Sequence, residues 1–198
     1  EKAIQYFTTA NELFTALSMV KYSGISLSKI AEIYDRSSIY DKAIDFYFQS
    51  LKKYDVVNFI EGKVINLERL GNIYSEMRNF SKAIEMYEQC LKIDEQRNDE
   101  AGISYDYNNL GNGYKDKGDL NKGYEYHQKA LEIRKKLGMN LEVGVSLGNI
   151  ANIFLEQRNF KKSLEYHKLA SEVFIKTDAQ VRIAQSYNNI SDVQIKLG

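Results

Sequence analysis

The feature that most constrains the fold is a pair of residues, a lysine followed by a small residue, that returns at a fixed interval of forty residues. The pair occurs at Lys2-Ala3, Lys42-Ala43, Lys82-Ala83, Lys122-Gly123 and Lys162-Ser163. No insertion or deletion disturbs the interval. Self-similarity at a period of about 20–50 residues predicts a stacked repeat array rather than one globular core.

Each repeat contains two helical patterns separated by a polar turn. The apolar and small positions of one repeat follow the i, i+3, i+4, i+7 spacing of a helix face, at Tyr107, Leu110, Gly111 and Tyr114, and again at Tyr124, His127, Ala130 and Leu131. Between them, Gly118 suits a helix C-terminus and Asp119 suits an N-cap. The unit is therefore predicted to be a helical hairpin, which buries its apolar faces by stacking on its neighbours.

The small residues and aromatic residues of the hairpin recur at matching positions. A pair made of Leu or Ile and a small residue stands at Ile30-Ala31, Leu70-Gly71, Leu110-Gly111, Ile150-Ala151 and Ile190-Ser191. An aromatic residue follows at Tyr34, Tyr74, Tyr114 and Phe154, and a second small position is held by Ser50, Cys90, Ala130 and Ala170. This pattern resembles the tetratricopeptide repeat over essentially the whole chain. The resemblance implies an all-α fold, a right-handed superhelical α-solenoid of stacked antiparallel hairpins.

The repeat departs from the common form in its length. The usual unit has about 34 residues, whereas this one has forty, and the chain contains no proline. The extra residues fall between units, at 94–102, 139–144 and 177–181, where they lengthen either helices or connectors. This longer form resembles the repeats of kinesin light chains, of LGN/Pins-type polarity proteins, and of bacterial peptide receptors and signalling proteins.

The domain organisation expected from the repeat is one array over residues 1–198. It consists of a half repeat at 1–20, four full repeats at 22–59, 62–98, 101–138 and 142–176, and a half repeat at 179–198. Arrays generally end in polar capping helices, and neither terminal segment has that character. We therefore expect the sequence to be a fragment of a larger protein.

The charge balance argues against nucleic acid and membrane partners. Lys and Arg number 27, as do Asp and Glu, so the formal net charge is zero and no sequence-independent attraction to polyanions is expected. No apolar run approaches the roughly 20 residues of a membrane span. The lone cysteine, Cys90, stands where the repeat needs a small core residue. A cytoplasmic location is expected.

Candidate binding residues come from the first helices of the hairpins, which the resemblance implies line a concave groove. One column is Lys29, Arg69, Asn109, Asn149 and Asn189, and the column three residues on is Glu32, Asn72, Asn112, Asn152 and Asp192. An amide both donates and accepts hydrogen bonds, so it suits the backbone of a peptide. The predicted peptide-binding residues are Arg69, Asn72, Tyr105, Asn109, Asn112, Asn149, Asn152 and Asn189. Under the alternative interpretation these asparagines are family consensus and bond one another or water.

No catalytic, metal or cofactor site is predicted. His127 and His167 stand one repeat apart, but Tyr47 and Tyr87 hold the same repeat position, so imidazole is interpreted as replacing a tyrosine ring in packing. No cysteine or carboxylate at that position completes a metal site. The sequence has neither a phosphate-binding loop nor a nucleophile with an adjacent base, so we do not expect an enzyme.

These observations favour a protein- or peptide-binding scaffold that serves as a sensor or docking arm of a larger signalling protein. Two alternatives remain open. The array is a structural scaffold that forms homo-oligomers through its exposed ends, or it is the regulatory domain of a bacterial signalling enzyme.

Overall fold

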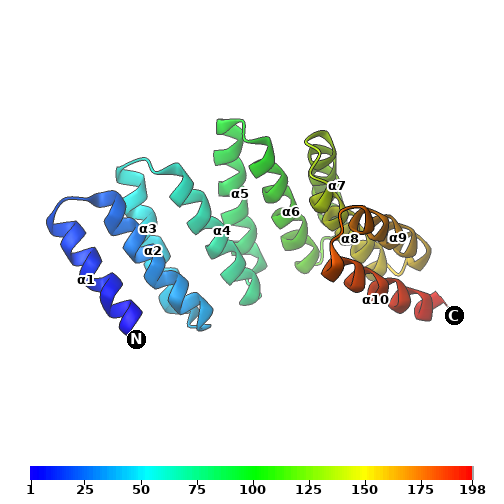
Figure 1. Ribbon diagram of the computed structural model, residues 1–198, viewed down its shortest axis with the longest axis horizontal. Helices are drawn as coiled ribbons and strands as arrows, with labels where there is room; N and C mark the ends of the chain where they lie inside the picture. The colour runs from blue at the N-terminus through cyan, green and yellow to red at the C-terminus, as the bar shows by residue number, and fades with distance from the viewer. Residues whose placement is uncertain (198) are drawn as a thin grey trace. The chain divides into compact units, whose positions relative to one another are not determined.

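The computed structural model describes residues 1–197, which form ten α-helices and no strand. The chain divides into two compact units, Glu1–Ile93 and Asp94–Gly198. Helices within each unit run antiparallel to their neighbours in the chain (Figure 1). The expected all-α fold of stacked antiparallel hairpins is confirmed.

Unit 1 contains four helices and most of a fifth. They are α1 (Lys2–Ala16), α2 (Val20–Arg36), α3 (Tyr40–Val56), α4 (Ile60–Glu76) and α5 (Phe80–Arg97), whose last residues belong to unit 2. Helix α2 packs against α1 and α3, and α3 packs against α4. The first helices of the two hairpins, α2 and α4, also touch. Cys90 is a free, fully buried thiol, as expected from its repeat position.

Unit 2 repeats this arrangement. It contains α6 (Glu100–Asp116), α7 (Leu120–Lys136), α8 (Asn140–Glu156), α9 (Phe160–Lys176) and α10 (Gln180–Leu197). Each helix packs against the next, and the first helices α6 and α8 also touch. Its core includes Leu131, Leu147, Ile150 and Phe174, drawn from α7, α8 and α9. First helices therefore lie side by side and share one face of the unit.

The extra residues of the forty-residue repeat lengthen the helices. Helix α5 runs to Arg97 and α6 begins at Glu100, so only two residues separate the hairpins there. Most of the ten helices have 17 residues, and the connectors between hairpins are as short as those within them. Among the described helices, none is long and apolar enough to cross a bilayer.

The recurring lysine and small residue have separate structural roles. The small residue is buried in four hairpins, as at Ala43 and Ala83, because the two helices of a hairpin approach closely there, whereas Ala3 of α1 is exposed. The lysine lies over an aromatic ring of the first helix in four hairpins, at Lys42–Tyr34, Lys82–Tyr74, Lys122–Tyr114 and Lys162–Phe154. Ammonium-to-centroid distances of 4.9–5.2 Å are typical of cation–π contacts.

Candidate functional site

Three of the predicted asparagines line one pocket in unit 2. Asn149 and Asn152 come from α8 and Asn189 comes from α10, while α9 contributes His167. This space, which we call the amide pocket, has a volume of about 110 Å³. The helical spacing predicted from sequence brings these amides together because α8 and α10 are first helices of successive hairpins.

Asn149 is held in place by a second asparagine that the sequence analysis did not single out. Its Nδ2 donates to Oδ1 of Asn108 at 2.9 Å, across the contact between α8 and α6. The same Oδ1 atom lies 3.5 Å from Nη1 of Arg134 on α7. Asn149 thus has an amide partner within the chain, although Asn108 lies outside both predicted columns.

Arg134 lies beside Asn108 and is only 1% exposed, which is unusual for a charged side chain. Its Nη1 donates to Oγ of Ser146 at 2.7 Å and to the carbonyl oxygen of Glu142 at 3.2 Å. Burial lowers the pKa of the guanidinium, and the nearby Tyr105 and Glu142 oppose that change. Arginine stays charged even so, and the hydrogen bonds offset the cost of burying the charge.

Tyr105 belongs to the same cluster. Its ring lies 5.3 Å from the Arg134 guanidinium, and its hydroxyl donates to Oε1 of Glu142 at 3.2 Å. The ring remains 43% exposed. Tyr105 is thus held between α7 and α8 with an open face, and its contact with a ligand stays a prediction.

The other predicted residues lie apart from the amide pocket. Asn109 and Asn112 are half-buried on α6 in unit 2. Arg69 and Asn72 are exposed on α4 in unit 1, where Oδ1 of Asn72 accepts a 2.7 Å hydrogen bond from the hydroxyl of Tyr87. Asn72 therefore contributes to packing within its hairpin as well as to the surface.

The two histidines are buried where other hairpins have tyrosine. His127 lies against Gly111, whose missing side chain makes room for the ring: a Cβ there would stand 2.7 Å from Cε1. Burial, and then the charges of Lys115 and Arg134, lower the pKa of His127 to about 3. Burial also lowers the pKa of His167. Both rings are neutral near pH 7. The described residues contain no group of three or more His, Cys, Asp or Glu side chains able to hold a metal ion.

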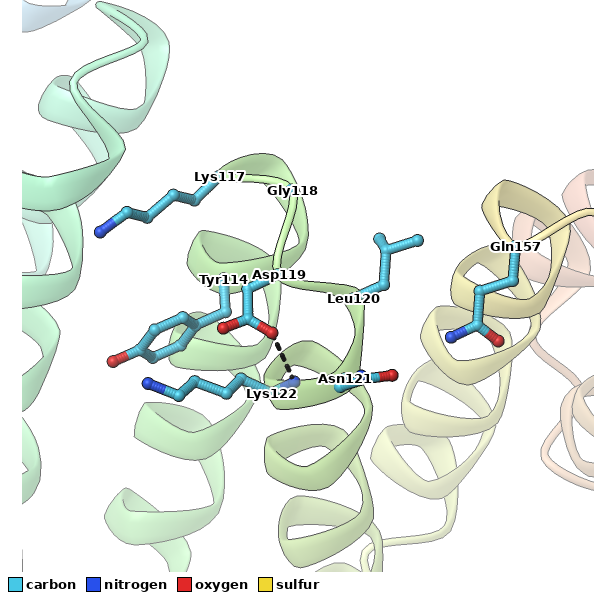
Figure 2. A pocket seen from close by; sticks show the side chains of 8 residues that line it. All are labelled: Tyr114, Lys117, Gly118, Asp119, Leu120, Asn121, Lys122 and Gln157. Atoms are coloured by element: carbon cyan, nitrogen blue, oxygen red, sulfur yellow. Dashed lines mark hydrogen bonds between the residues drawn. The ribbon is translucent and has the colours of Figure 1, made fainter.

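A larger hollow at the α6–α7 turn is explained by the repeat itself. Figure 2 shows Tyr114, Asp119 and Lys122 around the turn, with Gln157 facing them from the end of α8. Oδ1 of Asp119 accepts a hydrogen bond from the Lys122 backbone N–H at 3.1 Å, which caps α7. The ring and the lysine form the cation–π pair present in the other hairpins. These residues build the turn, so we do not interpret the hollow as a binding site.

The stacked hairpins and the amide-lined face define a helical repeat scaffold. Two models described as tetratricopeptide repeat match the sequence, one over residues 106–176 and one over residues 67–97. The chain belongs to the tetratricopeptide repeat family, and its fold is that of a protein-interaction scaffold. A search of curated protein sequences found no match.

Solved structures share the fold at low sequence identity. BtubC (BKLC) from P. vanneervenii aligns with a TM-score of 0.81 at 18% identity, over 100% of this chain and 84% of that one. A signal transduction ATPase from Pyrococcus horikoshii with a tetratricopeptide repeat sensor aligns with a TM-score of 0.80 at 18% identity, over 89% and 28%. A Rap protein complexed with Competence and Sporulation Factor aligns with a TM-score of 0.73 at 14% identity, over 96% and 56%. The chain thus spans only part of the latter two proteins.

Proposed function

We propose that the chain binds a peptide or a protein segment on the face formed by the first helices of unit 2. The observation that carries the proposal is the convergence of Asn149, Asn152 and Asn189 on one pocket. Each amide side chain both donates and accepts hydrogen bonds, so a row of them matches the alternating N–H and C=O groups of an extended backbone. Asn109 and Asn112 extend the row along α6.

The comparisons support this proposal by analogy. One structural neighbour is a Rap protein complexed with Competence and Sporulation Factor, and another carries a tetratricopeptide repeat sensor within a signal transduction ATPase. In the same way, this chain would be the sensor or docking arm of a larger signalling protein.

The test is a binding measurement on the Asn109→Ala, Asn149→Ala double variant. A peptide is first selected on the wild-type chain from a displayed random library, and its affinity is then measured by fluorescence anisotropy. We expect the double variant to bind roughly tenfold more weakly or worse, because each amide hydrogen bond contributes about 1 kcal/mol.

The matched control is Asn121→Ala, which removes an exposed amide from the second helix α7. It should leave the affinity unchanged, and circular dichroism should give the same helix content for all three proteins. Equal affinity in the double variant and the wild type, or failure of every library peptide to bind, would contradict the proposal.

Self-assembly is the second candidate function, and a separate observation favours it. Tyr6 of α1 and Leu17, the residue that follows α1, are 76% and 67% exposed, and Val181 and Ile195 of α10 are 71% and 76% exposed. Apolar side chains this exposed are suited to a protein interface. Light scattering over a concentration series tests this function, which predicts a mass that grows with concentration.

A further inference from the structure

Arg134 sets the direction of a hydrogen-bond relay that ends at the binding face. Its Nη1 atom, on α7, lies 3.5 Å from Oδ1 of Asn108 on α6, and the same Oδ1 accepts the 2.9 Å hydrogen bond from Nδ2 of Asn149 on α8. A guanidinium has N–H donors and no acceptor. The side-chain oxygen of Asn108 therefore faces Arg134, and only an N–H group of Asn149 can pair with that oxygen.

The contact between Arg134 and Asn108 is long for a hydrogen bond, so the positive charge does much of the orienting. Arg134 is 1% exposed, and its Nη1 also donates to Oγ of Ser146 and to the carbonyl oxygen of Glu142. All three acceptors are neutral, so these contacts do not cancel the charge. A buried charge acts on neighbouring dipoles more strongly than a charge in water, and it holds the oxygen of the Asn108 amide toward itself.

The relay decides which polar groups the two amides present to a ligand. Asn108 and Asn149 are half-buried on α6 and α8, the first helices that touch within unit 2. Because Nδ2 of Asn149 is directed at Asn108, Oδ1 of Asn149 points away from it, and Nδ2 of Asn108 points away from Arg134. The pair thus offers one acceptor from α8 and one donor from α6. An extended backbone pairs with a fixed acceptor only where it brings an N–H group.

Unit 1 has a relay at the equivalent place, but that relay stays inside the hairpins. Ser28, Asn66 and Ser50 pass hydrogen bonds of 2.7–2.8 Å from one to the next and finally to the carbonyl oxygen of Gly24. Ser28 holds the repeat position of Asn108. In unit 2 the longer asparagine side chain instead carries the relay outward to the column of predicted binding residues.

The next hairpin lacks the relay and provides an internal reference. Asn189 on α10 stands one repeat after Asn149, but Gly148 and Phe174 hold the repeat positions of Asn108 and Arg134. Neither residue has a polar side chain. These two positions therefore do not orient the Asn189 amide.

We propose that Arg134 is a positioning residue of the binding face. Acting through Asn108, it fixes the Asn149 amide so that Oδ1 accepts an N–H group of the bound segment. This inference rests on the proposed function and adds the direction in which the segment is read. A segment that lies the other way round places a C=O group against Oδ1, and the fixed amide does not turn to pair with it.

The first measurement needs no ligand and follows the side-chain amide protons by heteronuclear magnetic resonance of the full chain. One Nδ2 proton of Asn149 should exchange with water roughly fivefold more slowly than those of Asn189, or slower still, because it is donated to Asn108. Asn108→Leu removes the acceptor, and Arg134→Met removes the charge. Both should bring the exchange of the Asn149 proton close to that of Asn189.

Two conservative variants separate orientation from packing. Asn108→Asp keeps an acceptor for Asn149 but has no Nδ2 atom, and Arg134→Lys keeps a positively charged donor. Both should preserve the slow exchange of the Asn149 proton, which a purely structural role of Arg134 does not predict. The matched control is Lys135→Met, which removes a positive charge from the neighbouring exposed position on α7 and should leave the exchange unchanged.

The second measurement uses the library peptide selected on the wild-type chain. Each backbone amide of the peptide is replaced in turn by an ester, which removes one N–H group and keeps the shape. We expect one ester to bind the wild type roughly fivefold more weakly, the loss of one hydrogen bond. The same loss should persist in Asn108→Asp and shrink in Asn108→Leu and Arg134→Met, because a released Asn149 amide can turn its N–H toward the ester oxygen.

The outcomes distinguish this inference from the proposed function. Equal exchange of the Asn149 proton in the wild type and in Asn108→Leu overturns the inference, whether or not Arg134→Met folds. A peptide whose binding needs Asn149, but whose ester scan is the same in the wild type and in Asn108→Leu, leaves the proposed function standing and also overturns the inference. If no library peptide binds, the proposed function fails, and the exchange rates alone then decide whether Arg134 orients Asn149.

Discussion

At the scale of residues, two buried charged side chains, Asp94 and Arg134, stand at a repeat position where the other helices have an aromatic ring. At each turn one helical carbonyl group accepts a hydrogen bond from the backbone N–H five residues later. It belongs to an aromatic residue at seven of the nine described turns, and to Asp94 and Arg134 at the other two. The ring of Tyr54 packs on Gly24 and that of Phe174 packs on Gly144, where an added Cβ would stand 2.7 Å and 2.5 Å from ring atoms.

Arg134 differs in the residue that it faces. Ser104 holds the repeat position of Gly24 and Gly144, and it is fully buried. An aromatic ring at position 134 would meet the Cβ of Ser104, whereas the thin arginine stem does not. Burial and the Asp99 carboxylate raise the pKa of Asp94, which also shares a side-chain hydrogen bond with Asp106.

We therefore predict that Arg134→Phe lowers the free energy of unfolding by about 1–3 kcal/mol, the usual cost of overpacking a core. Adding Ser104→Gly should recover part of this loss, because it recreates the ring-on-glycine contact of the neighbouring hairpins. Urea unfolding of both single variants and the double variant gives the coupling energy. Additive effects of the two substitutions would show that the ring and Ser104 do not interact.

The buried histidines predict a loss of stability in acid. The pKa of His127 is about 3 in the folded chain and about 6.5 when unfolded. The unfolded chain therefore binds the proton first as the pH falls, so the stabilising contribution is complete above pH 6.5 and is lost between pH 6.5 and 3. From pH 7 to pH 5 the loss is about 2 kcal/mol.

The variant that isolates this effect is His127→Tyr, because tyrosine fits the same position beside Gly71 in the α4–α5 hairpin and does not titrate in that range. Urea unfolding at pH 7 and pH 5 should give the variant a pH-dependent loss smaller than that of the wild type by about 2 kcal/mol. Identical losses in the two proteins would mean that folding does not lower the pKa of His127.

At the scale of elements, the nine described turns share one geometry. A residue with positive φ recurs every twenty residues, and it is glycine only at Gly118 and Gly138. At each turn the backbone N–H of the following residue reaches back to the carbonyl five residues earlier, as Asp119 does to Tyr114 at 2.9 Å. This is the Schellman motif. The next helix then starts at once, and Asp99, Asp119 and Asn159 also cap it.

Left-handed backbone is unfavourable for residues other than glycine. Arg158 has a φ of 59° and an exposed side chain, so Arg158→Gly should raise the free energy of unfolding by about 0.5–1 kcal/mol. Gly118→Ala, at a φ of 93° with open space around it, should lower it by a similar amount. Thermal unfolding followed by circular dichroism measures both. A stabilised Gly118→Ala variant would contradict this account of the turns.

At the scale of the whole chain, the sequence predicts the fold better than the site. The forty-residue interval, the small residues and the turn at Gly118-Asp119 predict the hairpins, because helix packing repeats with the sequence. Asn149, Asn152 and Asn189 of the amide columns line one pocket, while ligand binding by them stays a prediction. The pocket that they line is not predictable in the same way. It also depends on Gly148, which has no side chain, and on His167, which stands where the hairpins of unit 1 have a larger tyrosine. The Arg134 cluster also escapes prediction, since repeat positions favour an aromatic residue there.

Stability should vary along the chain with the number of neighbours that each hairpin has. In arrays, each helix is stabilised by the helices on either side. Helix α1 has no buried residue and α10 has only Ser186 and Val193, whereas α8 has eight buried residues. Amide hydrogen exchange should therefore be fast throughout α1 and α10 and slowest in α8, because local opening exposes little apolar surface at α1 and α10.

The same measurement distinguishes a monomer from an assembly. Protection of α1 and α10 that stays low at every protein concentration would argue against self-assembly through these helices. Protection that rises with concentration, while α8 remains unchanged, would mean that a second copy covers Tyr6 and Leu17 or Val181 and Ile195. High protection of α1 at low concentration would contradict the prediction, because nothing in the described structure buries that helix.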